Sequence, residues 1–466
     1  MKKVYHILFI FTTVCLWSSC ANLDLDPLDT GSRDSWYSSE DEIQRSIGGL
    51  YRTVFFTLNG NESTIDYSPW SDDNQSRASL NFITGGTING ESDQVKKRWQ
   101  NGYKAIARAN ILLEKLEDAN SVGISEEKKQ LYRAQTLFVR ATQYAILTSL
   151  FGDVVYIDKE ISIDEAFEMG RTDREEVMEN VYKDLDEAAH YLPETYGTQR
   201  EFATKGAAYA IKARYALYNE DWELAAQAAK KCMDLQIYEL HPDFEELFIA
   251  STHHAKENIL SWPRSVELKN YLDVGAAMSY CPRNRGGYAS EYPSWELFCS
   301  FLCTDGLPID ESPLFDPQNP FKNRDPRCTA TIVEFGTEHV GVIYNPNPNI
   351  SRVWSAIAGK EITNLDCKTG SQYASYNGLL RKKGVDELWI NDGTFKVDPD
   401  FVFIRYGEVL LTYAEAKIEA NDIDQSVLDA INQVRARAYK KDYAAATGYP
   451  KVTTQDRDKL RQIVRR

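Results

Sequence analysis

The chain has 466 residues and is acidic, with 69 Asp and Glu against 53 Lys and Arg and a formal net charge of −16. Nucleic-acid binding depends on basic side chains that neutralise phosphates, so this charge argues against a nucleic-acid partner. The hydrophobic content of 43% is enough for a sizeable core, and the unusual feature of the composition is that 12% of the residues are aromatic.

The first residues predict export from the cytoplasm. The chain opens with MKK, continues through the apolar segment VYHILFIFTTVCLW and reaches Ser18, Ser19 and Cys20. This order is typical of a secretory signal, and the apolar segment is shorter than the about 20 residues that cross a bilayer. We therefore expect residues 1–19 to be a signal peptide and Cys20 to be lipidated, as in bacterial lipoproteins. An ordinary secretory signal with a chance Cys is the alternative, because Trp17 stands where Leu is usual.

Helical periodicity dominates residues 36–238. Apolar repeats predict two long helices, over 94–117 and 126–149. The second of these is expected to end at Gly152, which readily takes a left-handed cap. Two further helix starts are predicted by the spacing of a capping box, at the pairs Ser39/Glu42 and Thr172/Glu175.

Two segments, 204–234 and 405–438, have the pattern of antiparallel helical hairpins. In the first, an Ala-rich helix capped by Thr204 is followed by a tight turn at 219–221 and a second Ala-rich helix. Helix pairs of about 34 residues with small residues between them match the tetratricopeptide repeat. A last helix is expected after Thr453 or Thr454, with an apolar face made by Leu460, Ile463 and Val464.

Residues 240–403 differ in character from both flanks, since Pro and Gly are frequent and helical periodicity weakens. Asn391-Asp392-Gly393, between LWI and TFKV, predicts a β-hairpin. A loop-rich segment of this length is usually functional or disordered, and its aromatic content argues against disorder. The expected fold is therefore mainly α, with tetratricopeptide-like hairpins that support a loop-rich ligand-binding face with minor β structure. We expect one domain over 20–466, helical at 36–238 and 403–466.

No motif in the sequence specifies catalysis, a cofactor or a metal site. The pair His253-His254 is expected to lie in a solvated loop, and Asp72, Asp73 and Asn74 lack the spacing of a calcium-binding EF-hand. Cys299 and Cys303 would share a face if 294–303 is helical. With 69 acids, some carboxylates must lie close together, but the sequence selects no pair of the kind that hydrolyses glycosides.

The positive signal is the presence of aromatic residues beside planar polar groups in two loops, 61–77 and 270–292. An exposed Trp or Tyr offers a rigid flat surface to the apolar face of a sugar ring, while Asp, Asn and Arg form directional hydrogen bonds with hydroxyls. The alternative is that these aromatics pack the loops onto the helices. The candidate glycan-binding residues are Trp70, Asp73, Asn74, Arg77, Tyr280 and Tyr288.

Several segments in the same order resemble the SusD/RagB family. The family has a helix followed by an extended segment that is similar to YRAQTLFVRATQYAILTSLFGDVVYI (132–157), with Val155 where Pro is usual. The resemblance continues through the Ala-rich pair at 204–234, TDGLPI (304–309), NRDPR (323–327) and RYGEVLLTYAEAKIEA with INQVRARA (405–438). The family's C-terminal segment does not follow TTQDRDKLRQIVRR, so a missing C-terminal segment is expected.

The resemblance implies a non-catalytic lipoprotein, exposed on the outer membrane, that binds oligosaccharides and delivers them to a SusC-like TonB-dependent transporter. The helical hairpins would then face the transporter, and no cofactor is implied. Two other functions remain open on the sequence: a secreted glycoside hydrolase, and a lipoprotein of the same architecture that captures peptides or serves as a scaffold.

Overall fold

The computed structural model describes residues 36–58, 71–77, 83–117, 123–197, 201–385, 387–390 and 393–466. The predicted signal peptide and the lipidation site Cys20 lie outside these residues. Within them, no helix is both long enough and apolar enough to cross a membrane.

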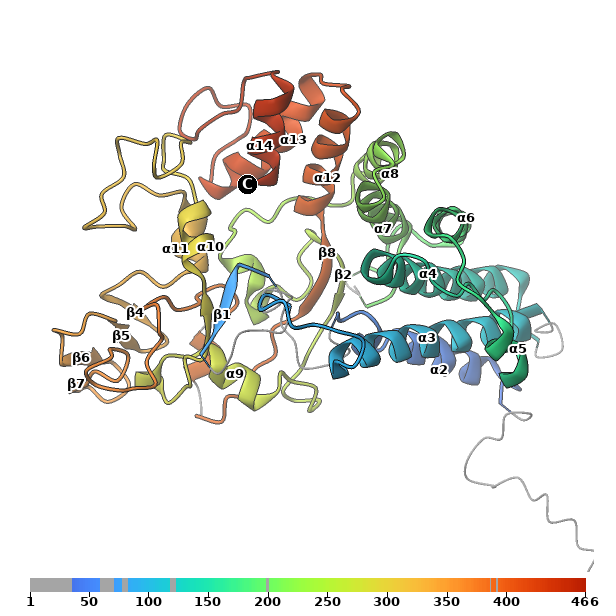
Figure 1. The fold of residues 1–466 in the computed structure, drawn as a ribbon, viewed down its shortest axis with the longest axis horizontal. Helices are drawn as coiled ribbons and strands as arrows, with labels where there is room; N and C mark the ends of the chain where they lie inside the picture. The colour runs from blue at the N-terminus through green and yellow to red at the C-terminus, as the bar shows by residue number, and fades with distance from the viewer. Residues whose placement is uncertain are drawn as a thin grey trace, which may run out of the picture.

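The helices of the first half pack in a row that follows the chain (Figure 1). Each long helix contacts the next, and the last helix of the row packs against a helix from the C-terminal part of the chain. One large core runs between them, and aliphatic and Ala side chains dominate it. The helices are α2 (Glu40–Leu50), α3 (Asp93–Glu117), α4 (Glu126–Phe151), α5 (Ile163–Glu168), α6 (Arg174–Tyr191), α7 (Lys205–Tyr218) and α8 (Trp222–Asp234).

Local capping explains where several of these helices begin and end. The predicted capping box at Ser39 and Glu42 is present at the start of α2, and Thr204 caps α7 by accepting the Ala207 N–H at 3.2 Å. Gly152 follows α4 with φ of 69°. This positive φ is easily reached only by glycine, so the predicted end of the helix is confirmed.

Two predicted caps are wrong because another residue holds the N-cap position: Asp173 at α6, whose side chain makes no capping hydrogen bond, and Asp456 at the last helix. Helix α6 begins at Arg174, and its first N–H donates to the Asp153 carboxylate at 3.0 Å. Thr172 instead forms a β-bridge with Val154. At the C-terminus the cap is Asp456, which accepts the Lys459 N–H at 2.9 Å, rather than either Thr453 or Thr454.

The two predicted hairpins are present and pack against each other. The second consists of α12 (Tyr406–Glu419) and α13 (Gln425–Ala438). Small side chains at Ala216, Ala225 and Ala416 let α7, α8 and α12 approach closely. Arg214 of α7 also pairs with Glu408 of α12, with 2.5 Å between Nε and Oε1.

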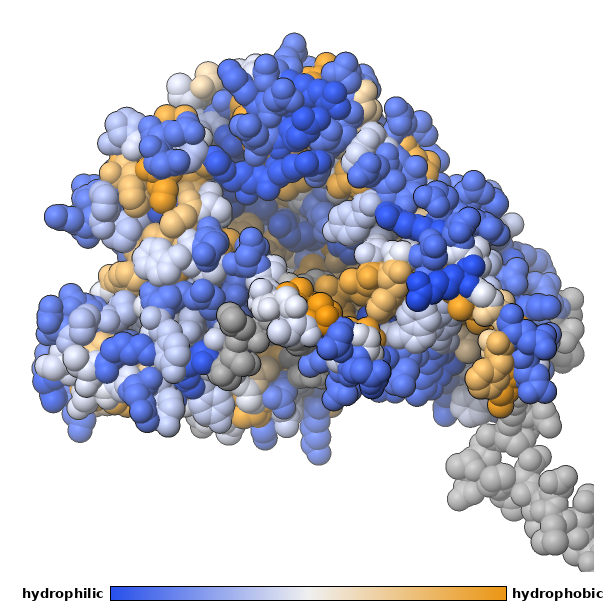
Figure 2. Space-filling model, in the orientation of Figure 1, coloured by the Kyte–Doolittle hydropathy of each residue, from blue (hydrophilic) through white to orange (hydrophobic). Residues whose placement is uncertain are grey.

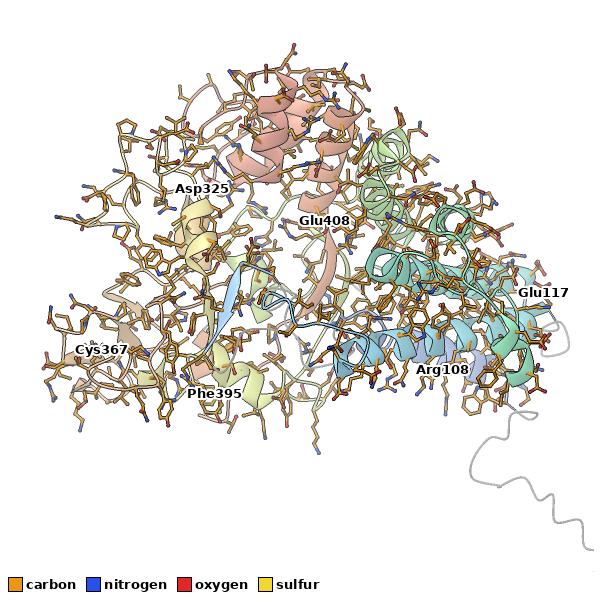
Figure 3. The ribbon with its side chains drawn as sticks, viewed as in Figure 1. Arg108, Glu117, Asp325, Cys367, Phe395 and Glu408 are labelled. Atoms are coloured by element: carbon orange, nitrogen blue, oxygen red, sulfur yellow. The ribbon has the colours of Figure 1, made fainter. Side chains whose placement is uncertain are left out.

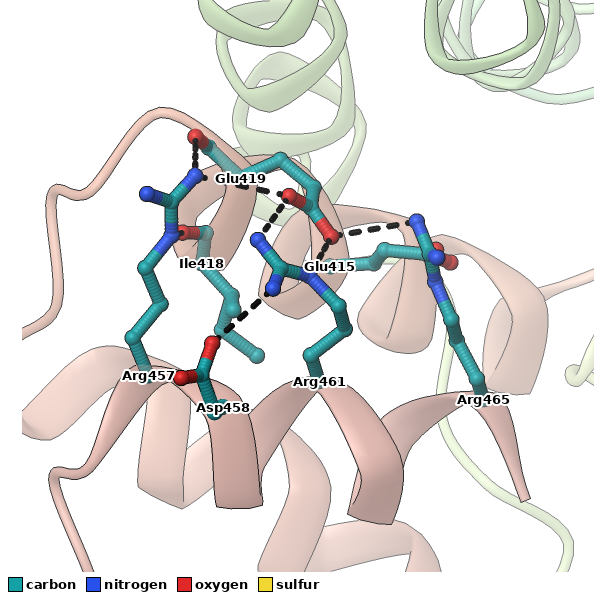
Figure 4. Close-up of polar contacts among 7 residues, drawn as sticks. All are labelled: Glu415, Ile418, Glu419, Arg457, Asp458, Arg461 and Arg465. Atoms are coloured by element: carbon teal, nitrogen blue, oxygen red, sulfur yellow. Dashed lines mark hydrogen bonds and ion pairs between the residues drawn. The ribbon is translucent and has the colours of Figure 1, made fainter.

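A short helix, α14 (Arg457–Arg465), docks on α12 through charged residues (Figure 4). Arg461 donates to both carboxylate oxygens of Glu419, at 2.6 and 2.7 Å, and Arg465 reaches the same carboxylate at 3.0 Å. The three-residue apolar face expected for this helix is confirmed, since Leu460 is buried and Ile463 and Val464 pack against the main core.

The loop-rich segment is closed by a two-stranded sheet and carries a small meander. Strand β2 (Asn258–Trp262) pairs antiparallel with β8 (Phe401–Arg405), so the chain leaves and rejoins the helical part at one place. The meander is β4 (Thr337–His339), β5 (Val342–Tyr344), β6 (Arg352–Ser355) and β7 (Lys360–Thr363). Three short helices lie between β2 and β4 in the sequence, namely α9 (Val274–Tyr280), α10 (Trp295–Ser300) and α11 (Pro326–Thr331).

One local prediction in this segment is wrong, and the condition for another is not met. The predicted hairpin around Gly393 is absent from the described residues, because Glu387–Ile390 forms a 3-10 helix and no strand follows it before β8; Asn391 and Asp392 lie outside the described residues. Helix α10 ends at Ser300, so Cys303 is not on its face; Cys303 is buried and Cys299 is exposed.

Candidate functional site

An open groove of about 520 Å³ lies between the start of α10 and the loops that flank the meander. Two large aromatic side chains on it are exposed, Trp295 at 41% and Tyr376 at 59%. We call this the aromatic groove; its lining residues include Trp295, Asn345, Asn347, Asp366, Lys368, Tyr376 and Asn377. Cys367, which lies between Asp366 and Lys368 in the sequence, is labelled in Figure 3 and marks this part of the chain.

Residues far apart in the sequence build the groove. Strand β1 (Asn74–Ser76) pairs antiparallel with β3 (Glu291–Pro293), which brings the 71–77 segment beside α10. Asn377 fixes the opposite loop to this pair, because its amide donates to the Pro293 carbonyl at 2.8 Å and to Gln75 Oε1 at 3.0 Å. These hydrogen bonds join β1, β3 and the loop of Asn377 at one wall of the groove.

A cluster of aromatic rings and cations borders the groove. The Arg77 guanidinium lies 5.3 Å from the Tyr373 ring centroid and donates to the carbonyls of Tyr288 and Tyr373. The Lys368 ammonium lies 3.5 Å from the Tyr376 ring centroid. Tyr288 and Tyr373 are also exposed, at 41% and 50%. This edge of the groove therefore combines flat apolar surfaces with hydrogen-bond donors.

Asp366 organises the loop that carries Tyr288. Its carboxylate accepts the backbone N–H of Arg283 at 2.6 Å and of Asn284 at 3.1 Å. Burial raises the pKa of Asp366 to about 6, against the pull of these two N–H groups and of the Arg283 charge. Because both oxygens are engaged by the backbone, this carboxylate holds the site together and is poorly placed to act on a ligand.

Comparisons with known proteins cover most of the chain. A family model described as "SusD family" matches residues 262–466, and one described as "Starch-binding associating with outer membrane" matches residues 23–217. The chain belongs to the SusD/RagB family. The resemblance noted in the sequence, and the mainly helical fold expected from it, are thus confirmed.

Individual SusD relatives agree with this assignment. The "SusD-like protein P2" of Formosa agariphila is 26% identical over 94% of this chain and 82% of its own length. A SusD-like carbohydrate binding protein from Bacteroides fragilis has a crystal structure that is 28% identical, with a TM-score of 0.76, over 92% of this chain and 83% of that one. A second SusD-like structure from the same species, 23% identical with a TM-score of 0.74, covers 95% of this chain and 85% of that one and shows the shared fold.

The structure does not bring the predicted site residues of this SusD-family chain together at one place. Arg77 and Tyr288 lie together at the edge of the aromatic groove. Tyr280 is 6% exposed and has the Arg381 guanidinium 4.8 Å from its ring centroid, so its ring offers no free face to a sugar. Trp70 lies outside the described residues.

Asp73 and Asn74 line a different cavity, a central cleft of about 450 Å³ below the C-terminal helices, which Figure 2 shows as a hollow. The Asn74 amide donates to Glu291 at 2.7 Å, and burial raises the pKa of that Glu. Of the described residues lining the central cleft, the aromatic ones, Phe244 and Phe301, are half-buried. This cleft therefore lacks the exposed rings of the aromatic groove.

The sequence did not predict three residues that line the groove, Trp295, Lys368 and Tyr376, or Tyr373 in the cluster that borders it. A usable signal was present, since the segment DCKTGSQYASYNG (366–378) combines aromatics with Asn, Gln and Lys in a turn-rich stretch. This is the same pattern that identified the loops at 61–77 and 270–292. Trp295 had no such signal, because it belongs to a short amphipathic helix.

The acidic and histidine side chains bear on metal binding and on catalysis. No group of three His, Cys, Asp or Glu is placed to hold a metal there. His253 is not simply solvated as predicted, because its Nδ1 lies 2.5 Å from the buried Asp400 carboxylate. Asp366 is the one acid among the described residues that line the aromatic groove, whereas glycoside hydrolysis ordinarily uses two carboxyl groups that flank the bond.

Proposed function

We propose that this protein captures oligosaccharides in the aromatic groove, without cleaving them, and passes them to a SusC-like TonB-dependent transporter. The observation that carries the proposal is the pair of exposed rings, Trp295 and Tyr376, on one open groove with the amide side chains of Asn345 and Asn347. Aromatic faces stack on the C–H side of sugar rings, and amide groups both donate to and accept from hydroxyls. The similar B. fragilis structure is that of a carbohydrate binding protein, which supports the same class of ligand.

The family and the N-terminal sequence support the proposed location and partner. A family model that matches this chain carries the description of association with the outer membrane. Lipidation at Cys20 would tether the chain there, with the helical hairpins available for the transporter. The tether is tested with the variant Cys20→Ala: release from the membrane fraction supports it, and unchanged membrane retention contradicts it. Co-purification of a barrel protein with the full chain tests the partner.

Binding is tested by affinity electrophoresis in gels that contain polysaccharides of different classes. Retardation in at least one gel is expected, and it should be lost in Trp295→Ala and in Tyr376→Ala. Trp354→Ala is the matched control, since Trp354 is 48% exposed on β6 and lies outside the lining of the groove. Equal retardation of all variants would contradict binding in this groove. Release of reducing sugar would instead favour the alternative of a glycoside hydrolase.

A further inference from the structure

Three basic side chains converge on the aromatic rings beside the groove. Arg77 and Arg283 lie 5.3 and 5.8 Å from the centroid of the Tyr373 ring. Lys368 lies 3.5 Å from the centroid of the Tyr376 ring, and the two tyrosines are three residues apart. Cation–π contacts of this kind are weakly stabilising where solvent reaches them, so they do not remove the positive charge of the cluster.

The hydrogen bonds of these cations go to neutral backbone carbonyls. Arg77 donates to Tyr288 and Tyr373, Arg283 donates to Gly287 at 2.8 Å, and Lys368 donates to Ala374 at 3.3 Å. Within the described part of the chain, none of the three side-chain cations forms an ion pair with a carboxylate, and Asp366 meets Arg283 at its backbone N–H. By contrast, several arginines of the helical part have carboxylate partners, among them Arg140 with Asp184, Arg214 with Glu408 and Arg437 with Glu257.

The local charge opposes the charge of the whole protein. The chain carries 69 acidic against 53 basic residues, yet three cations meet at this edge of the groove. The acid that lines the groove, Asp366, is 1% exposed and bonded to two backbone N–H groups, so it neutralises the cluster only in part. Burial and the Arg77 charge lower the pKa of Lys368, which is the effect expected where like charges lack a counter-ion.

We propose that the ligand of the aromatic groove is an anionic saccharide, in which sugar rings stack on the exposed aromatics and a carboxylate or sulfate group pairs with Lys368, Arg283 and Arg77. This inference rests on the proposed function and narrows its substrate class. Guanidinium groups bind both carboxylates and sulfates through paired N–H donors. An anion at this place supplies the counter-charge that the described residues do not.

The test uses isothermal titration calorimetry on the full mature chain with two matched pairs of ligands. The first pair is oligogalacturonate and the same oligosaccharide with its carboxyl groups reduced to alcohols. The second pair is a sulfated galactan oligosaccharide and its desulfated form. At least one charged ligand should bind about tenfold more tightly than its neutral partner, and the preference should shrink as salt is raised, because partly exposed charge pairs are screened. The two pairs distinguish a carboxylate from a sulfate.

The variants Lys368→Gln and Arg283→Gln should each reduce the charged-over-neutral preference, measured as the ratio of the two affinities. Lys396→Gln is the matched control, because Lys396 is also exposed and also lies over a tyrosine ring, 5.7 Å from the centroid of Tyr271. Equal affinity for charged and neutral partners would overturn the inference but leave glycan capture standing, provided that Trp295→Ala abolishes binding. If neither member of either pair binds, and no polysaccharide retards the protein, both the inference and the proposed function fail.

Discussion

The guanidinium of Arg77 donates to the carbonyl of Tyr373 and lies 5.3 Å from the centroid of its ring, although the two residues are 296 positions apart in the sequence. The same guanidinium donates to the Tyr288 carbonyl at 2.6 Å. One side chain therefore joins three loops at the edge of the aromatic groove. This arrangement makes Arg77 a structural tie as well as a source of positive charge.

Replacing this tie should loosen the groove edge. Arg77→Ala removes charge-assisted hydrogen bonds to two carbonyls, and we expect it to lower the free energy of unfolding by about 1–3 kcal/mol. Urea unfolding checks the value, and Arg45→Ala, at an exposed arginine of α2 outside the groove, is the comparison. A loss no greater than that of the comparison variant would contradict the role of Arg77 as a tie.

The loop beneath Tyr288 should not tolerate a side chain at Gly287. A Cβ atom there would collide with the Cys281 carbonyl and with its Cβ. Because the collision involves backbone, the loop must move, and overpacking of this kind costs about 1–3 kcal/mol. Gly287→Ala should therefore lower the melting temperature and weaken saccharide binding. Gly90→Ala, where a Cβ meets nothing within 4 Å, should leave both unchanged, and identical behaviour of the two variants would contradict the packing described.

Asp366 should make stability depend on pH in the acidic range. Its pKa is about 6 in the folded protein, against an ordinary value of 3.8, so folding favours the protonated form. The stability from this group is greatest below about pH 4 and is lost as the pH rises through about 6, by roughly 3 kcal/mol. Urea unfolding of the wild type and Asp366→Asn at pH 4.5, 5.5 and 7 checks this. The stability of the wild type relative to the variant should fall with pH, and a constant difference would contradict it.

Helix α14 should depend on Glu419, whose side chain is 8% exposed and faces Arg457, Arg461 and Arg465. The hydrogen bonds from Arg461, followed by the charges of the arginines, lower the pKa of Glu419. A carboxyl group with a lowered pKa stabilises the folded state at neutral pH, and this contribution is lost as the pH falls below about 4.5.

Glu419→Gln should therefore increase hydrogen exchange across Arg457–Arg465 at pH 7, because the arginines lose their common counter-charge. Asp458→Asn removes a carboxylate that is 83% exposed and pairs only with Arg461 among the described residues, so it should change exchange much less. If both variants protect α14 equally well, the account of its docking is wrong.

Most helices were predictable because their signals are local. The capping box at Ser39 and the cap at Thr204 lie within a few residues of the N–H groups that they satisfy. At α6 the error arose because tertiary contacts choose the start of the helix: Thr172 bridges to Val154, and the first N–H of the helix donates to Asp153. Local pattern carries no information about that choice.

The candidate site was predictable only in part, because it is assembled by contacts across the chain. Asn74 and Glu291, which meet across β1 and β3, are 217 residues apart. Tyr280 and Tyr288 have similar sequence surroundings, yet one is buried in a core and the other is exposed. The burial of Tyr280 depends on how α9 packs, and the composition of the sequence carries no information about that packing.

The central claim is that this SusD-family protein binds a saccharide in the aromatic groove. Calorimetric titration with an oligosaccharide from the class that retards the protein in gels tests this claim most directly. The titration compares the wild type with Trp295→Ala, Tyr376→Ala and Trp354→Ala. Loss of a central aromatic contact typically costs enough to weaken binding at least about tenfold. We predict that loss for Trp295→Ala and Tyr376→Ala, with wild-type affinity for Trp354→Ala. Wild-type affinity in all three variants would contradict the assignment of the groove.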